Sequence, residues 1–159
     1  FMGNEFAQER EWDHANSLDW ALLDRLEYRG IQMLVRDLNF LYRSLISVHS
    51  MEFSHSGFEW LDCHDATRSI IAYLRRGNGE KFIVVILNFS MVEILNYRVG
   101  VPVFGLYKEI LSSNCEIYGG DGAAINGELY SDAISHMGYP YSLLLDLSPL
   151  AGMIVTLLE

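Results

Sequence analysis

Apolar residues recur at three- and four-residue intervals between residues 31 and 45, which is the spacing of one face of a helix. Polar residues such as Arg36, Asp37 and Arg43 fall outside this stripe. The pattern predicts one long amphipathic helix over residues 31–45. Its apolar positions are Ile31, Leu34, Val35, Leu38, Leu41, Tyr42 and Leu45.

After Ser50 the pattern changes to short runs of β-branched and aromatic residues between turn residues. The runs are FEWLDC (58–63), SIIAYLRR (69–76), KFIVVILNF (81–89), VFGLYKEIL (103–111), SLLLDLS (142–148) and AGMIVTLLE (151–159). Gly77-Asn78-Gly79 predicts a hairpin, because Gly and Asn tolerate the positive φ of tight turns. Pro149 separates the last two runs. Short strands repeated in this way are typical of an antiparallel β-sandwich.

The first thirty residues are loop-rich, acidic and aromatic. Phe1-Met2 followed by Gly3-Asn4-Glu5 is the pattern of a buried strand end and the loop after it. Such a strand needs partners, so we expect the chain to be a piece of a longer protein. We divide it into residues 1–50, which hold the strand end, a loop and the helix, and residues 51–159, an all-β domain.

The charge balance narrows the classes of partner. The formal net charge is −10, from 11 basic and 21 acidic residues. Binding to a phosphate backbone depends on clustered Lys and Arg, so we expect no nucleic-acid partner. No apolar run approaches the ~18 residues of a membrane span, so we expect no membrane partner. A neutral sugar polymer is compatible with an acidic surface.

Two cysteines are too few for a disulfide scaffold, and neither lies at a metal-ligand spacing. We expect Cys63 and Cys115 to be reduced thiols in the core, and we expect no metal site. Asn88-Phe89-Ser90 matches a glycosylation sequon, but it ends an apolar run where Asn88 would be buried. We interpret that match as chance.

Nine short motifs, in order and at similar spacing, resemble the carboxyl-terminal part of bacterial glycogen branching enzymes, the 1,4-α-glucan branching enzymes of the α-amylase clan. They are MGNEFAQ (2–8), REW (10–12), SLDW (17–20), LVRDLN (34–39), GFEWL (57–61), NFS (88–90), YRVGVP (97–102), YKEIL (107–111) and SLLLDLSPL (142–150). The resemblance implies that MGNEFAQ is the last strand and loop of a (β/α)8 barrel. The helix at about 28–47 would then be the last barrel helix, followed by the clan's C-terminal β-sandwich.

The same resemblance implies a retaining transfer reaction in the cytoplasm. A carboxylate attacks the anomeric carbon to form a glycosyl-enzyme intermediate, while a carboxylic acid about 5 Å away protonates the departing oxygen. The 6-hydroxyl of another glucan chain, instead of water, then attacks this intermediate. An α-1,4 link is thus cut and an α-1,6 branch is formed without a cofactor. The family's catalytic carboxylates would all lie upstream of Phe1, so no catalytic residue is assigned here. We expect these 159 residues to stabilise the barrel and help hold glucan, and to be inactive alone.

Three residues are candidates for substrate binding. Glu5 would follow a barrel strand at the catalytic mouth. Its carboxylate either accepts hydrogen bonds from another residue of the site or from a sugar hydroxyl, or it fixes the backbone of the loop. Trp12 and Trp20 are suited to stacking on the apolar faces of sugar rings, although packing against the barrel's own helices is the alternative. Trp60 alternates with Phe58 along an expected strand, and we predict that it packs in the core.

Two other functions stay open. One is an autonomous, non-catalytic carbohydrate-binding β-sandwich, and the other is a different member of the amylase clan. The helix stripe is also expected to pack on barrel elements that lie outside this chain. We therefore expect an exposed apolar surface, or one that is covered by self-association.

Overall fold

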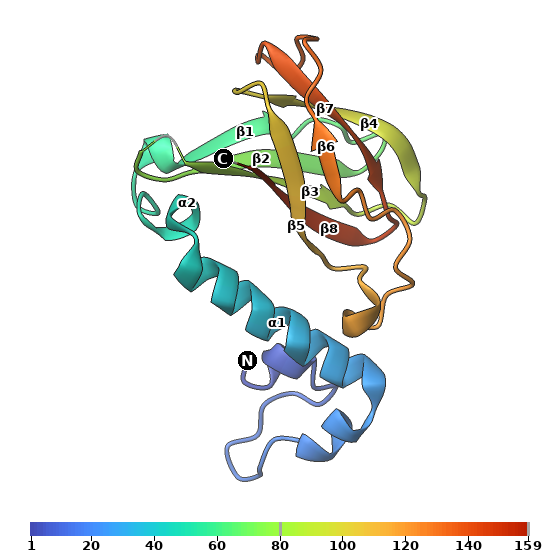
Figure 1. Ribbon diagram of the computed structural model, residues 1–159. Coiled ribbons are helices and arrows are strands. Elements are labelled where there is room, and N and C mark those ends of the chain that lie inside the picture. The colour runs from blue at the N-terminus through green and yellow to red at the C-terminus, as the bar shows by residue number, and fades with distance from the viewer. Residues whose placement is uncertain (80, 159) are drawn as a thin grey trace.

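A computed structural model describes residues 1–79 and 81–158 of the chain. Its main body is a sandwich of two antiparallel sheets, with a long helix and an N-terminal loop beneath it (Figure 1). Six strands form the larger sheet in the order β1-β2-β3-β8-β5-β6, and β4 and β7 form the smaller one. The strands are β1 (Phe58–Asp62), β2 (Ile70–Arg76), β3 (Phe82–Asn88), β4 (Ile94–Val101), β5 (Leu106–Ser112), β6 (Glu128–Tyr130), β7 (Tyr141–Leu147) and β8 (Ala151–Leu157).

The core lies between the two sheets and follows from alternation along each strand. On β2, Ile70, Ala72 and Leu74 are buried while the residues between them are partly exposed. Tyr97 on β4 and Tyr107 on β5 are the largest fully buried side chains. One continuous apolar cluster therefore joins both layers.

The helical part lies along one side of the larger sheet (Figure 1). Helix α1 (Leu26–Ser44) matches the predicted apolar stripe, and a short α2 (Ile46–His49) leads toward the sandwich. Short 3-10 turns η1 (Asn4–Phe6) and η2 (Trp20–Asp24) precede α1. Two further turns, η3 (His55–Gly57) and η4 (Glu116–Tyr118), flank the strands.

The six strands expected from the sequence are all present, with Glu159 at the end of the last expected run lying outside the described residues. The Gly77-Asn78-Gly79 connection joins β2 to β3, and the Gly77 amide donates to Lys81 O at 2.7 Å. Asn88 is buried, as expected, and its side-chain amide donates to Ser148 O at 2.9 Å.

Strands β4 and β6 were not predicted. In β4 the register shifts between Ile94 and Tyr97, and Asn96 between them has a positive φ of 55°. This bulge interrupts the alternation that a sequence pattern depends on. Strand β6 is only three residues long and pairs with β5 at the sheet edge.

The prediction that Trp60 packs in the core is wrong. Trp60 pairs with Tyr73, whereas the core-facing residues of β2 are Ala72 and Leu74. Directly opposed residues share one face of a sheet, so this register turns Trp60 to the outer face, where 52% of it is exposed.

Both cysteines are unbonded, but neither lies in the core, so the expectation that they are core thiols is wrong. Cys63 is exposed because it follows directly after β1, where the chain leaves the sheet. Cys115 is partly exposed beside η4.

No strand is formed at Phe1-Met2, where a strand end was predicted. Met2 has a positive φ of 64°, and Gly3 adopts the left-handed conformation before η1. A strand is held by ladder hydrogen bonds to its neighbours, and the described residues offer Phe1 and Met2 no neighbouring strand.

Candidate functional site

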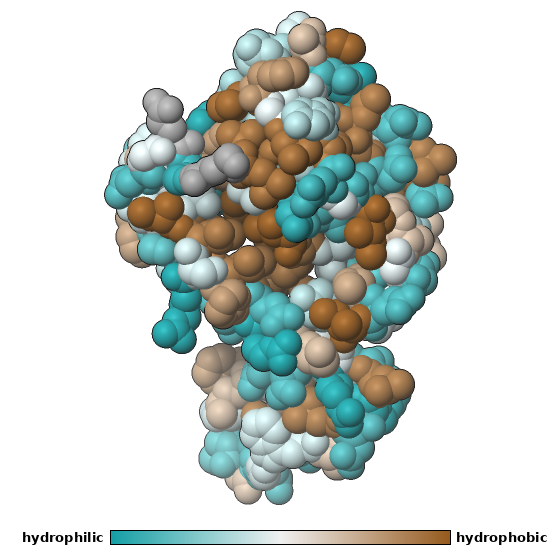
Figure 2. All heavy atoms as spheres, in the orientation of Figure 1, coloured by the Kyte–Doolittle hydropathy of each residue, from teal (hydrophilic) through white to brown (hydrophobic). Residues whose placement is uncertain are grey.

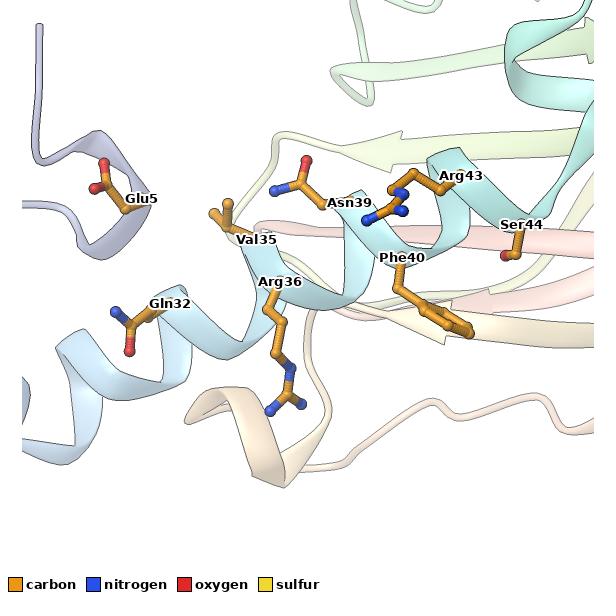
Figure 3. A pocket seen from close by; sticks show the side chains of 8 residues that line it. All are labelled: Glu5, Gln32, Val35, Arg36, Asn39, Phe40, Arg43 and Ser44. Carbon is orange, nitrogen blue, oxygen red and sulfur yellow. The ribbon is translucent and has the colours of Figure 1, made fainter.

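A hollow of about 760 Å³ runs along one face of α1, and Glu5 from η1 forms one side of it (Figure 3). The hollow is lined by Glu5, Gln32, Val35, Arg36, Asn39, Phe40, Arg43 and Ser44. Helical spacing places the α1 residues on one face, because residues three or four apart are neighbours on a helix surface. The sequence placed Arg36 and Arg43 off the apolar stripe, but it contained no signal for a hollow there.

The hollow combines one carboxylate with two guanidinium groups and two amides. Within the described part of the chain, Glu5 makes no ion pair, so its carboxylate is free to accept hydrogen bonds. Arg36 donates to Asp37 at 2.8 Å. Phe40 is 69% exposed and provides an apolar surface beside these polar groups. Such a mixture is suited to sugar hydroxyls and to the apolar faces of sugar rings.

The two candidate tryptophans lie in separate aromatic contacts. Trp12 meets Phe1 edge to face, with ring centroids 5.5 Å apart. Trp20 packs on the buried Phe6 at 5.4 Å. Both tryptophans keep about half of their surface exposed, at 46% and 53%. Because Phe6 follows Glu5 directly, Trp20 is anchored beside the turn that carries the carboxylate.

Polar side chains hold the loop between η1 and η2 in place. Gln8 accepts from the Asp19 amide at 2.8 Å and donates to Arg10 O at 2.8 Å. Arg10 then pairs with the Asp19 carboxylate at 2.8 Å. This network closes the loop that carries Trp12, and Gln8 had not been singled out from the sequence.

A second contact ties this loop to α1. The Tyr28 hydroxyl donates to Glu9, and the Arg25 guanidinium lies 4.7 Å from the Tyr28 ring centroid. The hydrogen bond to Glu9 raises the pKa of the Tyr28 hydroxyl. Hydrogen bonds therefore hold the loop together internally and also join it to α1.

The tyrosines of the sandwich mostly serve its packing. Tyr97 and Tyr107 are buried in the core, and Tyr107 donates to Val103 O at 2.7 Å. Tyr139 donates to Glu59, whose carboxylate also pairs with Arg76 at 3.0 Å. Burial, and then the hydrogen bond to Glu59, raises the pKa of Tyr139 to about 12.

An exposed aromatic cluster lies elsewhere, on the outer face of β1 and β2. Phe58 is 4.8 Å from Trp60 and 5.2 Å from Tyr73, measured between ring centroids. Trp60 and Tyr73 are 5.9 Å apart. The sequence reading assigned Trp60 to the core and so missed this cluster, although the register of β1 on β2 is what exposes it.

The hollow along α1 is lined by a single carboxylate among the described residues. Retaining chemistry needs two carboxyl groups about 5 Å apart. Glu5 is the one carboxylate among the residues that line the hollow. Over residues 1–79 and 81–158, no group of three or more His, Cys, Asp or Glu side chains is arranged to hold a metal ion.

The fold and the sequence together define the class of this chain. Residues 60–157 match the family described as "Alpha amylase, C-terminal all-beta domain", and the chain belongs to that family. A solved structure, titled "Crystal structure of the MutB D200A mutant in complex with glucose", resembles it over 80% of this chain and 18% of that one. The TM-score is 0.50 at 14% identity, which bears on the fold alone.

The particular relatives are 1,4-α-glucan branching enzymes named GlgB. The chain is 47% identical over 157 residues to that of Cellvibrio japonicus, with 99% of this chain and 21% of the relative covered. For Rubrobacter xylanophilus the identity is 49%, over 95% of this chain and 21% of the relative. The chain is thus homologous to the C-terminal region of these enzymes, and it spans about a fifth of their length.

No helix within the described residues has the length and apolar character needed to cross a membrane.

Proposed function

We propose that this chain is the C-terminal part of a 1,4-α-glucan branching enzyme that acts in the cytoplasm. The whole enzyme cleaves α-1,4 links in a glucan and transfers the released chain to a 6-hydroxyl, which creates the α-1,6 branches of glycogen. The observation that carries this proposal is the 47% identity to a branching enzyme over 99% of the chain. Identity at this level, sustained over both the helical part and the sandwich, favours a shared role.

Within that enzyme, residues 1–50 form the last strand, loop and helix of the catalytic (β/α)8 barrel, and residues 51–159 form the sandwich that follows it. The catalytic carboxylates belong to the barrel part outside this chain. The role of these 159 residues is to stabilise the barrel and to help hold glucan.

The test is an activity assay on two proteins. The 159-residue chain, incubated with amylose, should produce no new α-1,6 links, as measured by chain release with a debranching enzyme. The full parent polypeptide should produce them under the same conditions. New branches made by the 159 residues alone, or none made by the parent, would contradict the proposal.

Glu5, Trp12 and Trp20 are proposed to contact glucan in the parent. Glu5 has a free carboxylate, and both tryptophans present half of their surface. In the parent, Trp12→Ala should raise the KM for amylose several-fold with little change in kcat, because stacking of this kind contributes binding that is equal in ground and transition states. Leu144→Ala, on the outer face of β7, is the control. An unchanged KM would remove Trp12 from the glucan-contacting residues.

A second candidate function is an autonomous carbohydrate-binding sandwich. The observation that favours it is the exposed cluster of Phe58, Trp60 and Tyr73, because aromatic rings stack on sugars. Electrophoresis of the 159-residue chain in gels that contain glycogen tests it. Retardation that Trp60→Ala abolishes would favour this function, and normal migration would oppose it.

A further inference from the structure

The loop that carries Trp12 has no buried side chain of its own. Residues 9–17 are all exposed, and Gln8, at the start of the loop, is partly buried. Because no apolar core holds such a loop in place, its conformation depends on hydrogen bonds across its base. We call residues 8–19 the tryptophan loop.

Gln8 joins the two ends of the tryptophan loop with one side-chain amide. Its Nε2 donates to Arg10 O at 2.8 Å, and its Oε1 accepts from the backbone N–H of Asp19, also at 2.8 Å. The amide thus donates to one end of the loop and accepts from the other. A carboxylate could only accept here, and an apolar side chain of the same length could do neither.

The backbone of Gln8 is fixed to the turn that carries Glu5. The Gln8 backbone N–H donates to Gly3 O at 3.0 Å, and Gly3 has a positive φ of 81°. A Cβ added at Gly3 would lie 3.0 Å from the Gln8 Cβ, so the glutamine side chain packs directly on this glycine. Gln8 therefore holds the tryptophan loop from a fixed position.

The other contacts across the base of the loop are exposed. Arg10 pairs with the Asp19 carboxylate at 2.8 Å and donates to Ser17 O at 3.3 Å, but the side chains of the ion pair are 49% and 39% exposed. Exposed ion pairs contribute little to stability, because water and salt screen them. The partly buried hydrogen bond between Gln8 and Asp19 is therefore the main restraint across the base of the loop.

We propose that Gln8 is a positioning residue, which holds the tryptophan loop in the conformation that presents Trp12 to glucan. The inference rests on the proposed function, in which Trp12 contacts glucan in the parent enzyme. Stacking of an indole on a sugar ring needs a defined orientation, and a loop that had to be ordered during binding would lose affinity. A loop that Gln8 holds in advance avoids this loss.

The test is a double-mutant cycle in the full parent enzyme. Gln8→Met keeps the length of the side chain but removes both hydrogen bonds, and it is combined with Trp12→Ala. Gln8→Met should raise the KM for amylose several-fold and change kcat by less than about twofold, because it weakens binding and leaves the chemistry intact. In the Trp12→Ala background it should change the KM by less than about twofold, since the residue through which it acts is gone.

Asn78→Leu is the matched control. It also replaces an amide with an apolar side chain of similar size, at an exposed position in the β2–β3 hairpin, and it should change neither kinetic constant. Should Gln8→Met fail to fold, Gln8→Asn takes its place in the cycle. This variant keeps the amide but is one methylene shorter, so it cannot span both 2.8 Å contacts, and the same changes in KM are expected.

A second measurement follows the loop itself and does not depend on activity. Chymotrypsin cleaves after aromatic residues, so the rate of cleavage at the Trp12–Asp13 bond, followed by mass spectrometry, measures how readily the tryptophan loop opens. In the 159-residue chain, Gln8→Met should speed this cleavage several-fold. Asn78→Leu should leave the rate unchanged.

A KM that Gln8→Met leaves unchanged would overturn the proposal, whatever Trp12→Ala does. So would equal effects of Gln8→Met with and without Trp12, or a fall in kcat as large as the rise in KM, because Gln8 would then act through other groups. An unchanged rate of cleavage after Trp12 would show that Gln8 does not hold the loop. A parent that forms no branches would overturn the proposed function and this inference with it, whereas an active parent with an unchanged KM overturns this inference alone.

Discussion

Tyr118 connects the sandwich to α1 through one hydroxyl group. It lies in η4, and its hydroxyl donates to Asp37 on α1 at 2.9 Å. Burial, and then this hydrogen bond, raises the pKa of Tyr118 to about 12, so the hydroxyl stays protonated and can donate throughout the neutral range. On the other partner, hydrogen bonds from Arg36 and then from Tyr118 lower the pKa of Asp37 below its ordinary 3.8.

Tyr118→Phe should lower the free energy of unfolding of the 159-residue chain by about 1 kcal/mol, because it removes one hydrogen bond and keeps the ring. Urea unfolding followed by circular dichroism measures the change. Tyr130→Phe is the control, since Tyr130 is 69% exposed. If Tyr130→Phe lowered the free energy of unfolding as much as Tyr118→Phe, the hydrogen bond from Tyr118 to Asp37 would not be what stabilises the fold.

The lowered pKa of Asp37 predicts how the stability of the chain depends on pH. Its pKa is lower in the folded chain, so the stability that its ionised form provides is complete above about pH 4 and disappears as the pH falls through the lowered pKa. The stability difference between the unchanged chain and Asp37→Asn should therefore shrink between pH 6 and pH 3 in urea titrations. Asp24→Asn is the control, because Asp24 forms no ion pair among the described residues. A difference that does not vary with pH would contradict this account.

At the scale of single elements, strand β7 shows how one segment serves two environments. Leu143, Leu145 and Leu147 enter the core, and Leu144 between them is 39% exposed. Successive side chains of a strand point to opposite faces, so chemically identical leucines acquire different energetic roles. The same alternation turns Trp60 outward on β1.

Leu145→Ala should lower the free energy of unfolding by about 2–5 kcal/mol, because it leaves a cavity in a fully buried position. Leu144→Ala, one residue away, should cost less than about 1 kcal/mol. Thermal and urea unfolding of both variants give the comparison. Similar losses for the two leucines would mean that β7 does not face the core as described.

At the scale of the whole molecule, several large apolar side chains are exposed around α1. Phe40 is 69% exposed, Ile46 is 44% exposed and Leu38 is 39% exposed, and further apolar residues line a hollow of about 520 Å³ between the helices and the larger sheet (Figure 2). Exposed apolar patches of this kind mark interfaces with other protein segments. The described fold is therefore stable at its sandwich core but open beside α1.

We expect the 159-residue chain to enhance the fluorescence of a hydrophobic dye, because this surface offers the dye an apolar site. Replacing Leu38 and Phe40 together with serine should reduce the enhancement several-fold. The single variant Leu144→Ser, on the opposite layer, should reduce it little. If the chain gave no enhancement and scattered light as a monodisperse monomer, the apolar surface would not be accessible in solution.

Local patterns were sufficient to predict most of the elements. The three- and four-residue spacing of apolar positions depends only on helix geometry, and it predicted α1. Runs of β-branched and aromatic residues with turn signals likewise predicted six of the strands. Strand β4 was missed because its bulge at Asn96 breaks the pattern, and the short β6 is formed by its pairing with β5.

The candidate site could be predicted only in part. Glu5 was predicted at the catalytic mouth of a barrel, and that prediction stays untested; in this structure it lines the hollow along α1, while Trp12 and Trp20 lie in separate contacts with Phe1 and Phe6. Which residues meet across that loop depends on Gln8 and its hydrogen bonds, which carry no sequence signature.

By itself, the sequence determined the kinds of element, their order and the family to which the chain belongs, because each follows from local periodicity or from residues in a shared order. The tertiary structure alone decided which face of each strand is covered. That choice depends on strand register and on contacts between distant segments. It is why Trp60 is exposed, why the buried Nε of Arg75 has no hydrogen-bond partner among the described residues, and why a hollow remains between α1 and the larger sheet.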